Sequence, residues 1–166
     1  MLSVDELSDD KSNPLDILEF IVGQNEWPYE RMGDEEIVAA ITGEWCDFHM
    51  RYLWMADKNI LQCAGQLDVR VTAKFRPNIL EAITMINERL DMGYFSIWSD
   101  DNSIMFRSSF VPSTDANDTA QACDIVTKTI FAEINRYFPV FQFIIWGGKT
   151  PEDAIEATML ETVGNA

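Results

Sequence analysis

The chain has 166 residues, of which 47% are hydrophobic and 11% aromatic, which suits one domain with its own core and is too apolar for a disordered chain. Its net charge is −16, so nucleic acid and anionic membranes are not expected partners, because phosphate binding needs clustered Lys and Arg. Three widely spaced cysteines, no apolar leader segment and no apolar run long enough to span a bilayer predict a cytoplasmic protein.

The first residues are acidic and polar, so we expect a flexible tail at residues 1–12 and a single domain over residues 13–166. Asn13 can cap a helix, and Pro14 suits the first helical position. The apolar residues that follow predict a short amphipathic helix that ends near Gly23.

Residues 35–42, 45–56 and 60–71 predict the strands of an antiparallel meander, most clearly where apolar and polar side chains alternate. Residues 29–32 could form a strand that begins the first hairpin, or could be only an extended lead-in. One face of the strand at 45–56 is expected to point into the core, through Cys46, Phe48, Met50, Tyr52 and Trp54.

A helix is predicted from Pro77 to Asp91, followed by a second hairpin with its turn at residues 100–102. The longest helix should open near Asp115, and Pro139 should kink or break it. Residues 140–146 could continue this helix or form a buried strand, and we favour helix. The predicted fold class is α+β: an antiparallel sheet of about five strands with helices packed on one face, in the order α-βββ-α-ββ-α-α.

The segment from Gly147 to Thr150, GGKT, looks like the end of a phosphate-binding loop. The full pattern requires a glycine five residues before the second one, and Phe143 occupies that position. Bulky apolar residues in the loop would also prevent the backbone from wrapping a phosphate. The segment is better explained as a helix stop followed by a helix start, with Thr150 as the N-cap and Pro151 in the first turn.

No metal or catalytic pattern is present. The one histidine, His49, follows Cys46 by three residues, so alternation along a strand places the two side chains on opposite faces. A calcium loop beginning at Asp100 would need glycine and glutamate where Met105 and Val111 stand. The cysteines lack the spacing of zinc ligands. We expect no cofactor, no metal and no catalytic residue.

The face of the predicted sheet that points away from the core is not fully polar. Helices in one layer can cover only one face of such a sheet, so the other face would expose aromatic and Met side chains among charged ones, as protein interfaces do. The alternative is that the long helix folds over and buries some of them. The apolar residues on this face are Trp45, Leu53, Met55, Tyr94, Trp98, Met105 and Val111.

Three stretches resemble the YbjN family, whose members are described as bacterial sensory transduction regulators: NPLDILEFIVGQNEWPYER, RPNILEAITMINERLDMGYF and FPVFQFIIWGGKTPEDAIEATMLE. The resemblance extends from about Asn13 to Thr162. It implies a fold like that of type III secretion chaperones, which are small acidic α+β proteins that usually dimerise and bind extended segments of other proteins. It implies no catalytic residues, and the helix predicted at Thr150 to Glu161 goes beyond the minimal chaperone layout.

Together these features predict a non-enzymatic, cytoplasmic protein-binding module, chaperone-like or regulatory, that acts in bacterial signalling or stress response as a homodimer. The predicted partner contacts are Trp45, Leu53, Tyr94, Trp98 and Met105, and the predicted dimer contacts are Leu80, Thr84 and Met85. The alternative is a regulator that responds to a small molecule bound under the C-terminal helices. Its apolar pocket would be lined by Phe138, Phe141, Ile145 and Trp146.

Overall fold

The computed structural model describes residues 13–164, with side chains up to Leu160, so the tail predicted at residues 1–12 lies outside the described residues. Within this range the chain forms four helices: α1 (Pro14–Gln24), α2 (Arg76–Asn87), α3 (Ala116–Ile145) and α4 (Pro151–Gly164). The same range forms six strands: β1 (Tyr29–Met32), β2 (Glu36–Thr42), β3 (Asp47–Met55), β4 (Ile60–Arg70), β5 (Tyr94–Ile97) and β6 (Ser103–Phe110).

The six strands of the described range join one antiparallel sheet in the order β1-β2-β3-β4-β6-β5. The predicted α+β class is confirmed, but the order is α-ββββ-α-ββ-α-α, because residues 29–32 are a strand rather than a lead-in. The Ala40 N–H donates to the Pro28 carbonyl oxygen at 2.8 Å, which ties the entry of β1 to β2. The second hairpin places β6 beside β4 and β5 at the edge.

Side-chain alternation assigns the two faces of the sheet as predicted. Phe48, Met50 and Tyr52 of β3 are buried, while Asp47 and His49 between them are exposed. Alternation works as a guide on β2 and β3, where burial follows a period of two. It is a poorer guide on β6, where residues 103–106 are all buried.

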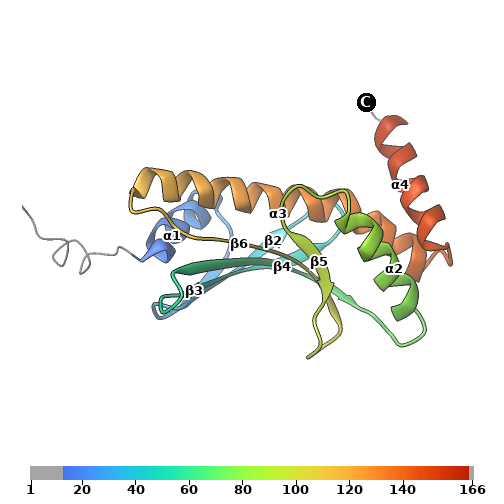
Figure 1. Cartoon of the computed structure of the whole chain (residues 1–166), viewed down its shortest axis with the longest axis horizontal. Helices are drawn as coiled ribbons and strands as arrows, with labels where there is room; N and C mark the ends of the chain where they lie inside the picture. Colours follow the sequence, from blue (N-terminus) through green and yellow to red (C-terminus); the bar gives the residue numbers. More distant parts are fainter. Residues whose placement is uncertain (1–12, 165–166) are drawn as a thin grey trace, which may run out of the picture.

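All four helices lie on one side of the sheet, with α3 running along it and α2 and α4 at the end opposite α1 (Figure 1). Gly65 of β4 lies directly beneath α3, and a Cβ atom at this position would collide with the side chains of Ile130 and Ile134. The missing side chain therefore allows α3 to approach β4 closely, as glycine does where elements pack tightly.

Helix α3, the longest helix, is continuous. The Asp115 carboxylate caps it by accepting the N–H groups of Asn117 (2.8 Å) and Asp118 (3.2 Å). The helix passes through Pro139 and extends to Ile145, so the open question about residues 140–146 is settled as helix and no break occurs. Pro139 and its neighbours on both sides are buried, and their packing offsets the backbone hydrogen bond that proline cannot donate.

Helix α2 ends at Asn87, four residues before the predicted end at Asp91. The Asn87 side chain forms two hydrogen bonds with the backbone of β5. Its amide donates to the Phe95 carbonyl oxygen at 3.1 Å, and its oxygen accepts the Phe95 N–H at 2.8 Å. The turn after α2 therefore forms as part of the junction with β5.

The GGKT segment joins α3 to α4, as predicted. Gly148 has a φ of 65°, the left-handed conformation that ends many helices, and the Lys149 N–H donates to the Phe143 carbonyl oxygen at 3.0 Å. The Thr150 hydroxyl accepts the Asp153 N–H at 3.2 Å, which caps α4. Two apolar residues of the outer helices, Phe20 of α1 and Leu160 of α4, are exposed.

Candidate protein-binding face of the sheet

Among the residues that the structure describes, no helix lies on the face of the sheet opposite α1 to α4 (Figure 1). Cross-strand pairing places residues on this outer face in rows, and these rows mix charged, polar and apolar side chains. One row crosses all six strands through Glu30, Val38, Arg51, Ala64, Arg107 and Tyr94. The next row contains Ala40, His49, Gln66, Met105 and Ser96. A contact surface on this face is therefore local, not one continuous apolar sheet.

Aromatic and basic side chains meet at one corner of the outer face, formed by Tyr94, Trp98 and Arg107, which we call the β5–β6 corner. Tyr94 pairs directly with Arg107 across the two strands and is 46% exposed. The Arg107 guanidinium lies 5.9 Å from the centre of the Trp98 ring, within the range of a cation–π interaction. Trp, Tyr and Arg are the residue types most enriched among energetically dominant interface contacts.

The hairpin turn holds Trp98 in place. The Trp98 N–H donates to the Ser103 carbonyl oxygen, and the Asn102 N–H donates to the Trp98 carbonyl oxygen, both at 2.8 Å. The Asp101 carboxylate accepts the Ser103 N–H and the Gln66 amide, each at 3.0 Å. Hydrogen bonds from Ser103, above all from its hydroxyl, lower the pKa of Asp101. The corner is thus presented by an ordered turn that is fastened to β4.

The five predicted contact residues do not form one patch. Tyr94 and Trp98 share the outer face at the two ends of β5, and Met105 shares this face, but its side chain is only 3% exposed. Leu53 lies two strands from β6 in another row, and Trp45, which is 51% exposed, stands in the loop before β3 rather than on the strand. Met105 is therefore too buried to offer a surface contact.

Arg107 was not among the predicted contacts, although a signal for it existed. It is two residues from Met105 on the same strand, so it shares the outward face of Met105. A search restricted to apolar residues passes over such a position.

The two edge strands of the sheet, β5 and β1, are protected in different ways against pairing with another strand. At the β5 edge, Asn87 occupies both backbone groups of Phe95, so strand addition is blocked there. The β1 edge is four residues long, and Arg31 ties it to α1 through Asp16 and Glu19, each at 2.7 Å. Short and covered edges are common protection against unwanted strand pairing.

The predicted dimer contacts lie on the outer side of α2. Leu80 is 41% exposed, and Thr84 is exposed, with its hydroxyl donating to the Leu80 carbonyl oxygen at 3.0 Å. Met85 is partly buried and packs against the core. Leu80 and Thr84 are therefore accessible, whereas Met85 is only partly so.

The predicted pocket under the C-terminal helices has a different lining from the one expected. Phe138 and Phe141 are buried in the core, so they line no pocket. Ile145 and Trp146 instead border an open cleft of about 410 Å³ together with Lys74, Phe75, Asn78, Ile144, Gly148 and Lys149. The two expected phenylalanines are thus absent from the lining, and two lysines add positive charge to its apolar and aromatic residues.

The thiols are not arranged for nucleophilic chemistry. Burial, reinforced by Asp47 and Asp68, raises the pKa of Cys46 to about 11, and burial raises that of Cys123 to about 12. The same cause raises the pKa of Cys63, so all three remain protonated at neutral pH. Among the described residues, no group of three or more His, Cys, Asp or Glu side chains could hold a metal ion.

The fold is that of an α+β protein whose six-stranded antiparallel sheet, within the described range, is covered by helices on one face. The chain belongs to the YbjN family, because the model of that family, described as "Putative bacterial sensory transduction regulator", matches residues 14–143. Helix α4 lies beyond the matched region.

The structure is also similar to a solved one, described as "Crystal structure of YbjN, a putative transcription regulator from E. coli". The two share 10% sequence identity with a TM-score of 0.47, over 73% of this chain and 90% of the other. No curated protein sequence matches the chain. Within residues 13–164, no helix combines the length and the apolar character needed to cross a membrane.

Proposed function

We propose that this YbjN-family protein is a cytoplasmic, non-enzymatic regulator that acts by binding a protein partner on the outer face of its sheet. The observation that carries the proposal is the uncovered face with Tyr94, Trp98 and Arg107 grouped at one corner. Rigid aromatic side chains lose little conformational entropy on binding and bury a large area, which makes them effective anchors. Trp45 and Leu53 would contribute outlying contacts.

Affinity capture from the bacterial cytoplasm tests the proposal. Wild-type protein and the double variant Tyr94→Ala/Trp98→Ala would be compared, with Phe20→Ala as the control, since Phe20 is 66% exposed and lies on α1, which packs on β2, β3 and α3. We expect a protein that co-purifies with the wild type and the control to be lost with the double variant. Equal recovery with all three would rule out the corner.

We also propose a homodimer formed through α2, supported by the exposed Leu80 on an outer helix face. Replacement of Leu80 by Glu would place a charge in the centre of such an interface, and the protein should then sediment as a monomer. The exposed Leu160 on α4 provides the control substitution, Leu160→Glu. A mass that does not change with Leu80→Glu would exclude this surface.

The second candidate is a regulator that responds to a small molecule, and the cleft beside Trp146 favours it. Lys74 and Lys149 border a cleft that also contains the aromatic rings of Phe75 and Trp146, a combination that suits an anionic, planar ligand. A thermal-shift screen with metabolites separates the two candidates. A large shift with one compound, abolished in Lys149→Ala, would support the cleft.

A further inference from the structure

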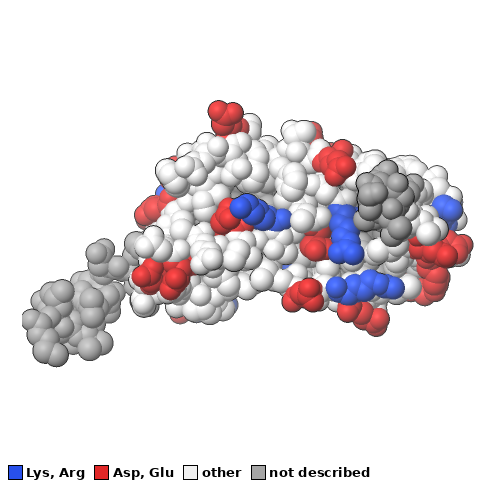
Figure 2. Space-filling model, turned by 90° about the horizontal axis from the view of Figure 1, so that it is seen from above, with Lys and Arg blue, Asp and Glu red and all other residues white. Residues whose placement is uncertain are grey.

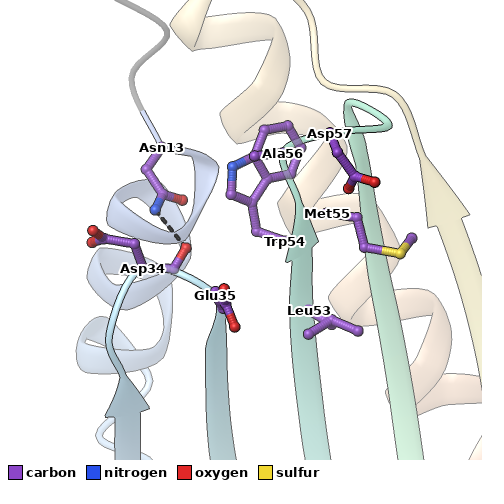
Figure 3. Close-up of a pocket in the computed structure, with 8 residues that line it drawn as sticks. All are labelled: Asn13, Asp34, Glu35, Leu53, Trp54, Met55, Ala56 and Asp57. Carbon is purple, nitrogen blue, oxygen red and sulfur yellow. Dashed lines mark hydrogen bonds between the residues drawn. The ribbon is translucent and has the colours of Figure 1, made fainter.

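A second concave site lies at the end of the sheet opposite the β5–β6 corner. It has a volume of about 710 Å³ and lies between the β1–β2 turn, the β3–β4 turn and the start of α1 (Figure 3). Four of its lining residues are apolar and three are acidic. They are Asn13, Asp34, Glu35, Leu53, Trp54, Met55, Ala56 and Asp57.

Hydrogen bonds hold the walls of this cleft together. The Asn13 side-chain amide donates to the Asp34 carbonyl oxygen at 2.9 Å, which fixes the start of α1 against the β1–β2 turn (Figure 3). The Trp54 N–H donates to the Glu35 carbonyl oxygen at 2.7 Å and so joins that turn to β3. The cleft is therefore a feature of the folded chain, assembled from three segments that are distant in sequence.

The cleft carries an excess of negative charge. None of the described residues that line it is basic. Arg31 approaches Asp34 at 3.5 Å, but the same guanidinium is closer to Asp16 and Glu19, at 2.7 Å each. Among residues 13–160, Glu35 and Asp57 form no ion pair, so their carboxylates face solvent uncompensated.

The apolar part of the cleft is only half-buried. Leu53 and Met55 lie on the outer face of β3 and are partly exposed, so a ligand that covered them would remove apolar surface from water. Trp54 lies on the opposite face and packs against the core. An apolar floor with acidic walls complements a ligand that is apolar in the middle and positively charged on both sides. Seen from the helix side, acidic side chains are spread over the surface with basic ones among them (Figure 2), so surplus charge alone does not distinguish the cleft.

We propose that this cleft binds a segment of a partner protein in which apolar side chains are flanked by Lys or Arg. The inference rests on the proposed protein-binding function and gives the chemistry of a second contact. The chain's own residues 1–12 are a poor occupant, because they carry four acidic residues and one lysine. A second copy of the chain, with a net charge of −16, would bring further negative charge to these acidic walls, whereas the dimer proposed through α2 uses the other end of the sheet.

Synthetic peptides provide a direct test, with fluorescence anisotropy at low ionic strength as the readout. The probe is Gly-Lys-Leu-Lys-Leu-Lys-Gly, compared with versions in which Ser replaces Leu or Glu replaces Lys. The variant Asp34→Asn/Glu35→Gln/Asp57→Asn should bind the probe about tenfold more weakly than the wild type, given the modest value of each exposed charge pair. Leu53→Ser should weaken binding of the leucine probe but not of the serine version.

The matched control removes three exposed carboxylates from α2 and α4, through Glu81→Gln, Glu88→Gln and Glu156→Gln. It changes net charge equally, so an equal loss in the control and the cleft variant would overturn the proposal. Tighter probe binding in Leu2→Ser/Val4→Ser/Leu7→Ser would overturn it in favour of the chain's own tail. A change of mass in the cleft variant would overturn it in favour of a second copy.

These outcomes are separate from those that test the β5–β6 corner. If peptide binding depends on the cleft while Tyr94→Ala/Trp98→Ala still captures the partner, the proposal for the corner is wrong and the proposal for the cleft is supported. The reverse combination would remove the cleft alone.

Discussion

The two faces of the sheet differ most clearly at two consecutive residues of β5. Phe95 points toward the helices and makes edge-to-face contacts with Phe106, Tyr137 and Phe141, with ring centroids 4.9, 6.0 and 5.5 Å apart. Tyr94 points to the outer face and pairs with Arg107. The same alternation thus places one aromatic ring in the core and its neighbour on the surface. Aromatic character alone therefore does not tell whether a residue stabilises the fold or binds a partner.

The largest expected effect separates these two rings. Phe95→Ala should lower the free energy of unfolding by about 3–5 kcal/mol, because it removes a buried ring and leaves a cavity. Tyr94→Ala should change it by less than about 1 kcal/mol, as is usual for exposed positions. Chemical denaturation measures both. Similar losses for the two variants would mean that the outer face is covered in solution, as in a dimer formed through the sheet.

The contact between α2 and the β5 edge is the next test. Asn87→Ala removes two hydrogen bonds and leaves the backbone groups of Phe95 without partners, which should cost about 2 kcal/mol. The control is Asn78→Ala, at an exposed asparagine on the same helix. The freed edge should also favour self-association, detectable by light scattering. Stability equal to that of the control would show that water replaces Asn87 without loss.

The spacing of apolar residues along the sequence was enough to predict those parts of the fold that depend on neighbouring residues alone. The buried residues of α3, among them Cys123, Ile130 and Phe141, recur with the period of a helix. The end of α2 could not be predicted in this way, because it depends on a hydrogen bond to a strand that follows eight residues later. Helix propensity alone continues past Asn87, and tertiary contacts decide the boundary.

The candidate sites were harder to predict than the fold, for a related reason. The outward direction of the Met105 side chain was predicted correctly, but its burial depends on cross-strand neighbours such as Gln66 and Ser96. The acid-rimmed cleft combines Asn13, residues 34–35 and residues 53–57, which come together only when β2 and β3 pair. A sequence gives the direction of a side chain more readily than the shape of the surface around it.

A smaller effect tests the polar contact within the covered side. The hydroxyl groups of Tyr52 and Thr127 are hydrogen-bonded at 2.8 Å in the core. Tyr52→Phe should lower stability by about 1 kcal/mol, because the Thr127 hydroxyl is left buried without its partner. In Tyr52→Phe/Thr127→Val both groups are gone, so the double variant should be less destabilised than the sum of the two single changes. Simple additivity in thermal or chemical unfolding would argue against this bond.

The smallest expected effect concerns Glu133 on α3, the helix that runs along the covered face of the sheet. Its Oε2 atom is shielded from solvent and has no hydrogen-bond partner among the described residues. Burial, reinforced by Asp91 and opposed by Arg136, raises the pKa of this carboxyl. An acid whose pKa is raised by folding binds its proton more tightly in the folded state. Stability should therefore fall as pH rises through the ordinary glutamate pKa of about 4.3, and stay lower above the raised value.

The variant Glu133→Gln should consequently be more stable than the wild type at neutral pH, by less than about 1 kcal/mol, since the side chain is partly solvated. Near pH 4 and below, the wild-type carboxyl is itself protonated, and the two proteins should converge. Glu156→Gln removes one exposed charge on α4 and controls for the change in net charge. If the benefit of Glu133→Gln persisted unchanged in acid, it would come from packing, because a cost of ionisation vanishes once the carboxyl is neutral.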